Sequence, residues 1–126
     1  TMSSLVLGLQ IGFHCTVLIA VNNFRDMDGD VKVGKRTLPV RFGKNFARAE
    51  IFVLLFLPFL MNIYWYTRGA VWAALAGFLV FPLALILIRK ILTTEPSPIY
   101  NRFLGMSAAI HLAFGLLTSV GLVLCR

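Results

Sequence analysis

The sequence lacks the alternation of apolar and polar residues that is typical of β-strands, and it contains no internal repeat. Charged residues are also few, at 13% of the 126 residues. The only two cysteines, Cys15 and Cys125, give no metal-ligand spacing. One lies in the middle and one near the end of separate apolar runs, so we expect no disulfide between them and interpret both as small hydrophobic residues. These absences argue against a β-sheet protein and against a metal site built from cysteines.

Apolar residues instead make up 59% of the chain, more than is usual for a soluble domain, and they fall into long runs. A membrane-spanning helix needs about 20 mostly apolar residues. The sequence therefore predicts an all-α protein, a polytopic bundle with transmembrane helices at about residues 2–21, 47–66, 70–88 and 103–124. No charged leader or cleavage site precedes the first run, so it does not resemble a signal peptide. Because Thr1 opens the chain inside an apolar run, we expect a fragment of a longer protein.

Basic residues are distributed unequally among the segments that join the predicted spans. Ten of the twelve lie in or beside segments 25–46 and 89–102, and only Arg68 and Arg126 lie on the opposite side. Positive residues accumulate on the cytoplasmic side of membrane proteins, so this bias predicts that both segments face the cytoplasm. The net charge of +7 is then mostly a topology signal, and it does not indicate binding to nucleic acid.

Several residues within the spans have structural explanations. Tyr64, Trp65 and Tyr66 cluster at the end of a span, as expected for an aromatic belt at the membrane interface. His14 and His111 lie inside spans, and we expect them to be hydrogen-bonded residues of the bundle rather than ligands.

The most polar stretch is NNFRDMDGDVKVGKRTLPVRFGK, residues 22–44. Asn22, Asp26 and Asp30 are four residues apart, and on a helix each such step turns the side chain by only about 40°. The three would share one face at the end of the first span, with Asp28 pointing roughly the other way. Two carboxylates one turn apart repel each other unless a cation lies between them. The spacing therefore suits a hard divalent cation such as Mg²⁺, which also takes phosphate oxygens as ligands.

Positive charge follows these aspartates in the chain. Lys35, Arg36 and Arg41 would lie close to the position in which phosphate groups are held. Carboxylates, a cation and basic residues at a membrane surface indicate a diphosphate whose tail lies in the lipid.

A second polar segment, TEPSPIYNR at residues 94–102, is rich in proline and is predicted to be a loop on the same side. It could cover the site. Tyr100, Asn101 and Arg102 could then meet the acceptor or the diphosphate.

Three other interpretations of the aspartates remain open. DMDGD resembles the start of an EF-hand calcium loop, but counted from Asp26 the sixth residue is Val31 rather than glycine, and the twelfth is Thr37 rather than glutamate. The aspartates could instead belong to a solvated turn that only ends a helix, although charged residues beside a span usually have a function. A transporter or another non-enzymatic bundle could also use them as a cation site.

Residues 22–44 resemble the second aspartate-rich motif of the UbiA superfamily of membrane prenyltransferases. The pairs Asn22–Asn23 and Arg25–Asp26, then Asp30, and GKRTLPVRFG at residues 34–43 carry the match. Within the superfamily this stretch is most similar to the branch that prenylates 1,4-dihydroxy-2-naphthoate in menaquinone synthesis. The resemblance implies a fold of nine transmembrane helices, of which this chain would hold the last four.

The resemblance also implies a reaction, the Mg²⁺-dependent transfer of a prenyl group from a polyprenyl diphosphate to an aromatic acceptor. Asp26 and Asp30 would be the metal-binding and catalytic residues, and Asn22, Lys35 and Arg36 would bind the diphosphate. With 1,4-dihydroxy-2-naphthoate as acceptor the product would be demethylmenaquinone, and 4-hydroxybenzoate, homogentisate and haem- or chlorophyll-type acceptors remain open. The protein would lie in the inner membrane of a bacterium with its active site facing the cytoplasm.

The first aspartate motif of the superfamily is missing from these 126 residues, because no second segment rich in Asn and Asp follows Asp30. The superfamily builds its site from both motifs. We therefore expect the full-length protein to be the enzyme and this piece alone to be inactive.

Overall fold

The computed structural model describes residues 1–126 and contains helices but no strands, which confirms the predicted all-α class. The helices follow one another in the order α1 Met2–Arg25, α2 Met27–Lys32, α3 Leu38–Phe42, α4 Lys44–Leu60, α5 Asn62–Thr67, α6 Val71–Phe78, α7 Phe81–Thr93 and α8 Tyr100–Leu124.

Four helical stretches are long and apolar enough to cross a membrane: Met2–Lys32, Lys44–Thr67, Val71–Thr93 and Tyr100–Leu124. Three of them combine two helices with a short break between. One break precedes α7, whose second residue is Pro82, and proline cannot donate the hydrogen bond that would continue α6. Such breaks do not prevent a helix from spanning a membrane, and the lengths and compositions are those of an integral membrane protein.

Residues 25–46, which the sequence analysis treats as a loop, contain the two short helices α2 and α3. Helix α2 continues the path of α1 after Asp26, whose φ of −92° and ψ of 0° lie just outside α-helical geometry. Helix α3 has Pro39 in its first turn, where the fixed φ of proline suits a helix start. It ends at Gly43, whose φ of 89° lies in the left-handed region that favours glycine.

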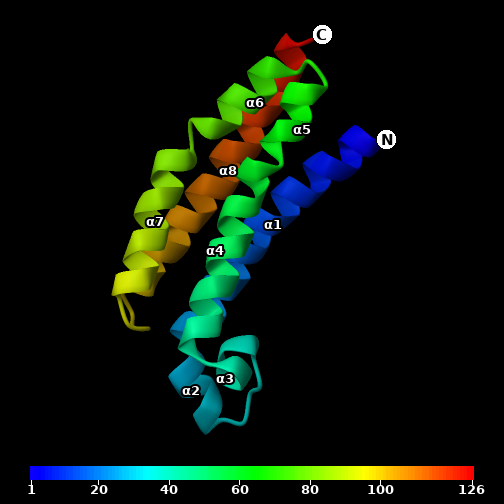
Figure 1. Cartoon of the computed structure of the whole chain (residues 1–126). Coiled ribbons are helices and arrows are strands. Elements are labelled where there is room, and N and C mark those ends of the chain that lie inside the picture. Colours follow the sequence, from blue (N-terminus) through cyan, green and yellow to red (C-terminus); the bar gives the residue numbers. More distant parts are fainter.

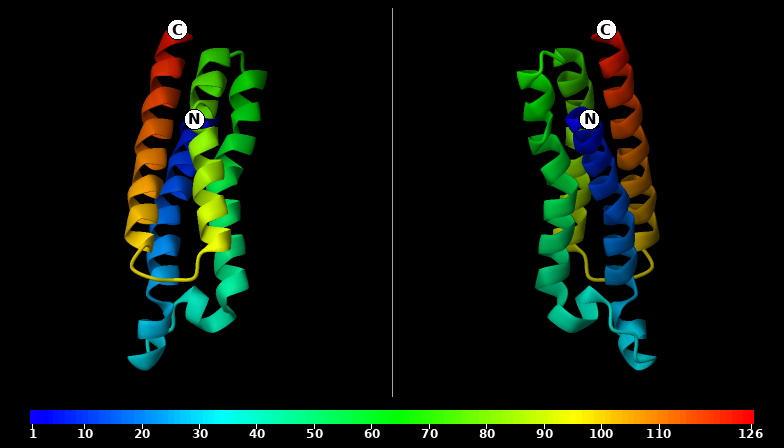
Figure 2. Two further views of the ribbon diagram at one scale, coloured as in Figure 1. Left: turned by 90° about the vertical axis from the view of Figure 1, so that its left-hand side faces the viewer. Right: turned by 90° about the vertical axis from the view of Figure 1, so that its right-hand side faces the viewer.

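The four long stretches pack side by side as an antiparallel bundle (Figure 1). Helix α1 packs against α4 and α8, α6 packs against α8, and α7 packs against α4 and α8. The segment with α2 and α3 lies at the same end of the bundle as the α7–α8 loop, and both chain termini lie at the other end (Figure 2). The first of these ends, which carries residues 22–44 and 94–101, is termed the motif end below.

The bundle interior is apolar along most of its length, while many large apolar side chains lie on the outside. Buried core residues include Val21, Phe24, Ile51, Leu55, Leu87, Ile91, Ile110 and Phe114. Exposed apolar residues include Ile19, Leu60, Leu79, Leu112 and Leu116. An apolar exterior of this kind suits contact with lipid rather than water.

A network of buried polar side chains joins α1 to α4 and α5. Gln10 Nε2 donates hydrogen bonds to the carbonyl oxygen of Pro58 and to Asn62 Oδ1, both at 2.8 Å. Trp65 Nε1 donates to Gln10 Oε1 at 2.7 Å, and the Trp65 side chain is buried. Trp65 is therefore part of the bundle interior rather than the interfacial anchor expected from the aromatic cluster, whereas the neighbouring Tyr66 is exposed.

The two histidines within the spans differ in their contacts. His14 is buried, with Nε2 3.0 Å from the carbonyl oxygen of Leu55 and its ring against Phe59 and Phe114, as expected for a residue of the bundle interior. For His111 the expected hydrogen bond is not found, because its buried Nδ1 has no partner.

Helices α6 and α8 approach each other very closely at Gly121. A Cβ atom added to Gly121 would lie 2.5 Å from the Cα and 2.6 Å from the backbone nitrogen of Ala73. By contrast, a Cβ on Gly115 of the same helix would meet only the side chain of Ile11, at 3.9 Å. Small residues permit such approaches in membranes, where helices associate largely through close packing.

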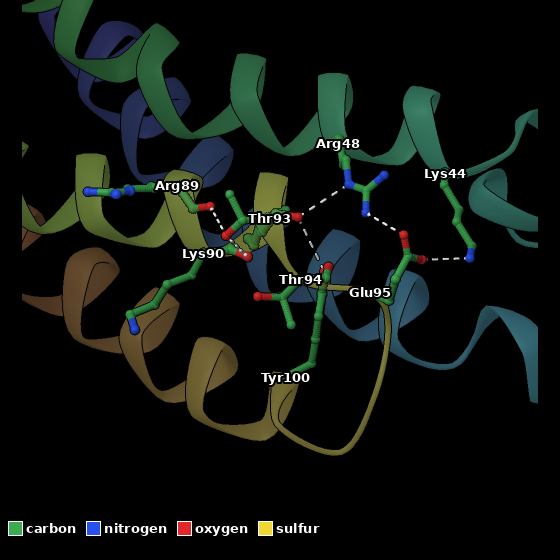
Figure 3. Close-up of polar contacts among 9 residues, drawn as sticks. Lys44, Arg48, Arg89, Lys90, Thr93, Thr94, Glu95 and Tyr100 are labelled. Atoms are coloured by element: carbon green, nitrogen blue, oxygen red, sulfur yellow. Dashed lines mark hydrogen bonds and ion pairs between the residues drawn. The ribbon is translucent and has the colours of Figure 1, made fainter.

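The loop between α7 and α8 is tied to α4 by an ion-pair cluster at the motif end (Figure 3). Glu95 accepts hydrogen bonds from Lys44 Nζ at 2.6 Å and from Arg48 Nη2 at 3.4 Å. These bonds, that of Lys44 foremost, hold the pKa of the Glu95 carboxyl below its usual value. Arg48 Nε also donates to the carbonyl oxygen of Ile91 in the last turns of α7, at 3.2 Å.

Tyr100 holds the same loop from its other end. Its hydroxyl donates a hydrogen bond to the carbonyl oxygen of Thr94 at 2.6 Å, and its buried ring meets Phe24 edge-on with centroids 5.5 Å apart. The Arg48 guanidinium lies 5.4 Å from the centroid of the Phe24 ring, within cation–π distance. The loop is therefore held at both ends, and this fixes the position of residues 97–99 between them.

The close approach at Gly121 makes its replacement by alanine destabilising. In Gly121→Ala the added methyl group would collide with the α6 backbone, and overpacking of this kind costs typically about 1–3 kcal/mol. The midpoint of thermal unfolding in detergent should fall. Gly115→Ala is the matched control, because its methyl group has room and alanine favours a helix over glycine by roughly 0.5–1 kcal/mol. Equal midpoints for the two variants would contradict the packing of α6 on α8.

The ion pairs of Glu95 should stabilise residues 94–99 to an extent that depends on pH. Because the pKa of Glu95 is lower in the folded protein, the stabilisation is fully present above its usual value of 4.5 and is lost as the pH falls through the folded-state pKa. In Glu95→Gln, amide hydrogen exchange of residues 94–99 should be faster than in the wild type at pH 7, after correction for intrinsic rates. The difference between the two proteins should begin to shrink below pH 4.5 and should vanish once the pH lies below the folded-state pKa of Glu95.

The matched control for this measurement is Glu50→Gln, because Glu50 makes no ion pair. It should leave exchange of the loop unchanged. Identical exchange of Glu95→Gln and wild type at pH 7 would show that the cluster does not hold the loop.

Candidate functional site at the motif end

The candidate site begins with three polar residues on successive turns at the end of α1. The amide of Asp26 donates to the carbonyl oxygen of Asn22 at 3.1 Å, and the amide of Asp30 donates to that of Asp26 at 2.8 Å. The backbone therefore climbs by one helical turn at each step, although α1 formally ends at Arg25. The two aspartates and Asn22 thus lie along the same helical path, as the spacing in the sequence requires.

Asp30 is buried, at 8% exposure, and its carboxylate is incompletely satisfied. One oxygen, Oδ1, lies 3.9 Å from Lys35 Nζ, and the other, Oδ2, has no hydrogen-bond partner. A buried carboxylate oxygen without a partner is costly in free energy unless a positive group compensates it. The environment of Asp30 is therefore suited to a cation.

Asp26 is more exposed and is fully paired by its neighbour in the chain. Arg25 donates from Nε to Asp26 Oδ1 at 2.7 Å and from Nη2 to Asp26 Oδ2 at 3.0 Å, which is a two-bond, fork-like pairing. The same guanidinium donates to Asn22 Oδ1 at 2.8 Å and, from Nη1, to Asn101 Oδ1 at 2.6 Å. Arg25 therefore links the end of α1 to the first turn of α8.

An open pocket of about 290 Å³ lies between the end of α1 and the α7–α8 loop. Its lining residues are Arg25, Asp26, Ser97, Pro98 and Asn101, none of which is hydrophobic. Four of the five lining residues carry polar or charged side chains, so the pocket offers several hydrogen-bonding groups to a charged or polar ligand.

The segment 94–102 contributes to this pocket in a different way for each residue named in the sequence analysis. Asn101 lines the pocket and contacts Arg25. Tyr100 is instead buried beneath the loop, where its hydroxyl bonds to the backbone (Figure 3). Arg102 is exposed and makes no side-chain hydrogen bond or ion pair.

The structure separates the two basic residues that were expected to bind a diphosphate. Lys35 lies next to Asp30 and remains half-exposed. Arg36 is exposed, makes no ion pair with either aspartate, and contributes only its carbonyl oxygen, which accepts a bond from Arg41 Nε at 3.2 Å. Lys35 is thus brought to the aspartates and Arg36 is not.

Arg25 was not among the site residues predicted from the sequence. The available signal was its position directly before Asp26, within the motif that resembles the prenyltransferase family. Adjacent residues on a helix point about 100° apart, so sequence spacing alone does not predict that the Arg25 side chain folds back onto the Asp26 carboxylate.

No group of three or more histidine, cysteine, aspartate or glutamate side chains gathers in a way that could hold a metal ion by itself. The motif end offers two carboxylates one turn apart, one of which has an unpaired oxygen. Mg²⁺ is commonly held by one or two carboxylates together with phosphate oxygens and waters. The donor set at Asp26 and Asp30 therefore fits a hard divalent cation that arrives with a phosphate-bearing ligand.

Comparison with known proteins gives independent evidence for the family of this chain. The UbiA prenyltransferase family profile matches residues 1–113. Curated relatives named UbiA prenyltransferase domain-containing protein 1 include that of Gallus gallus, which is 29% identical over 98% of this chain and 36% of its own length. The Homo sapiens protein of the same name is 29% identical over 95% of this chain and 34% of its own length.

The chain spans about a third of the length of these curated relatives. No solved structure gives a significant match. Because the family profile covers nearly the whole sequence, from the first residue to the middle of α8, the chain belongs to the UbiA prenyltransferase family.

Proposed function

We propose that the full-length protein containing this chain transfers a polyprenyl group from a polyprenyl diphosphate to an aromatic acceptor, with the diphosphate held at the motif end. The observation that carries the proposal is the buried carboxylate of Asp30, whose Oδ2 has no partner, one helical turn from Asp26. Family membership supports prenyl transfer as the kind of reaction. It also favours the enzyme over a transporter that would use the aspartates only as a cation site.

Mg²⁺ is the proposed cofactor, and the residues present fit it. Asp26 and Asp30 would hold the ion, with the Asn22 side-chain oxygen in support, and phosphate oxygens would complete its coordination. Bound there, Mg²⁺ would stabilise the negative charge that develops on the leaving diphosphate.

The chain's own residues have separate roles in this proposal. Lys35, whose Nζ lies 3.9 Å from Asp30 Oδ1, would add positive charge close to the bound diphosphate. The α7–α8 loop, held by Glu95 and Tyr100, forms a fixed wall of the pocket through Ser97, Pro98 and Asn101. As the bond between the allylic carbon and the diphosphate oxygen breaks, the diphosphate leaves with the bonding electrons, the allylic carbon forms a bond to a ring carbon of the acceptor, and that ring carbon loses the group it carried. The apolar bundle beside the site would keep water away from the cation that develops on the prenyl carbon.

The proposed acceptor is 1,4-dihydroxy-2-naphthoate, which would lose its carboxyl group as CO₂ when it is prenylated and give demethylmenaquinol, the reduced form of demethylmenaquinone. Support comes from residues 22–43, whose pattern is most similar to that branch of the family. The asymmetry of basic residues supports a site on the cytoplasmic side of the membrane, which would be the inner membrane in a bacterium. Because the chain spans about a third of its relatives, the activity is proposed for the full-length protein, and these 126 residues alone should be inactive.

Removing either site carboxylate should abolish most activity of the full-length protein. Asp26→Asn and Asp30→Asn each keep the side-chain shape and remove the charge, and we expect kcat/KM for prenyl transfer to fall by at least about 100-fold, as for loss of a key charge-stabilising group. The assay follows prenylated product from a polyprenyl diphosphate in detergent. Asp28→Asn is the matched control, because Asp28 is exposed and unpaired in the same segment, and it should stay within about twofold of wild type.

If Asp28→Asn lost as much activity as the other two variants, general loss of negative charge would explain the effect. If Asp30→Asn kept full activity, the proposed site would be wrong.

The acceptor and cofactor are tested together by assaying the full-length protein with a panel of acceptors. Product should form from 1,4-dihydroxy-2-naphthoate and a polyprenyl diphosphate with Mg²⁺, and it should disappear when a chelator removes the metal. Turnover of 4-hydroxybenzoate or homogentisate instead would keep the reaction class and replace the acceptor. Undiminished turnover without divalent metal would contradict the role given to the aspartates.

A further inference from the structure

We propose that Arg25 is an exchangeable counter-ion: it neutralises Asp26 while the site holds no cation, and it transfers to the diphosphate when a cation takes its place on Asp26. This inference rests on the proposed function and adds a role for a residue outside the predicted site. Its basis is the unequal pairing of the two carboxylates, since Asp26 is fully engaged by Arg25 while Asp30 keeps an unpaired oxygen.

The unequal pairing makes one aspartate available to a cation and the other not. A divalent ion finds a free oxygen at Asp30, but to be held by Asp26 as well it must share that carboxylate with the Arg25 guanidinium or replace it. Two positive groups on one carboxylate repel each other. Arg25 therefore opposes binding of a cation that arrives alone.

A phosphate-bearing ligand removes this conflict, because Arg25 already lines the polar pocket beside Asp26. The guanidinium side chain is 25% exposed, so a ligand in the pocket can reach it. Its fork of donors pairs with phosphate oxygens in the same two-bond manner as with a carboxylate. The exchange thus replaces one charged hydrogen-bond acceptor of Arg25, the Asp26 carboxylate, with another, a phosphate group.

Asn101 provides a fixed point for this exchange. Its Oδ1 accepts from Arg25 Nη1 at 2.6 Å, and the residue lies in the first turn of α8, directly after the loop tied down by Glu95 and Tyr100. A guanidinium retained by Asn101 can turn from Asp26 towards the pocket without leaving the site. Arg25 is thereby a positioning and charge-balancing residue that favours the cation and the diphosphate binding together over the cation binding alone.

The inference predicts that loss of the Arg25 charge changes the affinities for two ligands in opposite directions. In Arg25→Met, Mn²⁺ alone, used as a probe for the divalent ion, should bind about fivefold more tightly, because the competing charge is gone. Inorganic diphosphate at saturating Mn²⁺ should bind about tenfold more weakly or worse, because a charge-assisted pairing is lost. Electron paramagnetic resonance of free Mn²⁺ measures the first affinity, and equilibrium dialysis of radiolabelled diphosphate measures the second, both on the full-length protein in nanodiscs.

Two further variants exclude simpler explanations. Lys32→Met is the matched control, because Lys32 is an exposed residue of α2 without an ion pair, and its loss should change neither affinity by more than about twofold. Arg25→Gln retains hydrogen-bonding capacity towards Asn22 and Asn101 but removes the charge. It should show the same pair of opposite shifts and protects the test against misfolding of Arg25→Met.

The outcomes separate this inference from the proposed function. Opposite shifts in the Arg25 variants support the exchange. If both affinities fall together or neither changes, while wild type binds both ligands and Asp30→Asn does not, the site stands and the exchange is wrong. If the wild-type protein binds neither Mn²⁺ nor diphosphate, both the exchange and the proposed site are wrong.

Discussion

The structure depends on one constraint, that peptide groups in an apolar medium must satisfy their hydrogen bonds within their own segment. Four helical stretches meet this constraint, and their outer surfaces carry large apolar side chains such as Leu60 and Leu112. Polar side chains inside the bundle are tolerated where they pair, as Gln10 does with Asn62 and Trp65. Most charged side chains are consequently confined to the ends, and most of them are concentrated at one end.

That concentration of charge is what makes a site possible at the motif end. The Lys44–Glu95–Arg48 cluster fastens the α7–α8 loop to α4, and the same loop brings Pro98 to the end of α1. Asn101, directly after the loop, brings the first turn of α8 to Arg25. A charged motif on one helix and a loop about 70 residues later in the chain thereby line one pocket. Basic residues outnumber acidic ones at this end, yet the buried carboxylate of Asp30 keeps one oxygen without a hydrogen-bond partner.

The proposed chemistry depends on the Asp30 carboxylate oxygen that has no partner. Prenyl transfer requires a leaving diphosphate to be stabilised and a carbocation to be kept from water, so it needs a fixed polar pocket next to an apolar bundle. The motif end has this arrangement, and membership of the UbiA prenyltransferase family agrees with it. The chain spans about a third of the length of its curated relatives.

The sequence by itself determined the helical class, the number of apolar stretches and the four-residue spacing of Asn22, Asp26 and Asp30, because these depend on local periodicity and length. Side-chain contacts between distant segments were beyond its reach. Trp65 could not be distinguished from an interfacial anchor, nor Lys35 from Arg36 as the neighbour of Asp30, because packing against other helices decides which way each side chain points. Only the tertiary structure joined Arg25 to Asn101 and left Asp30 Oδ2 unpaired, since both facts depend on where α8 and the α7–α8 loop lie relative to the end of α1.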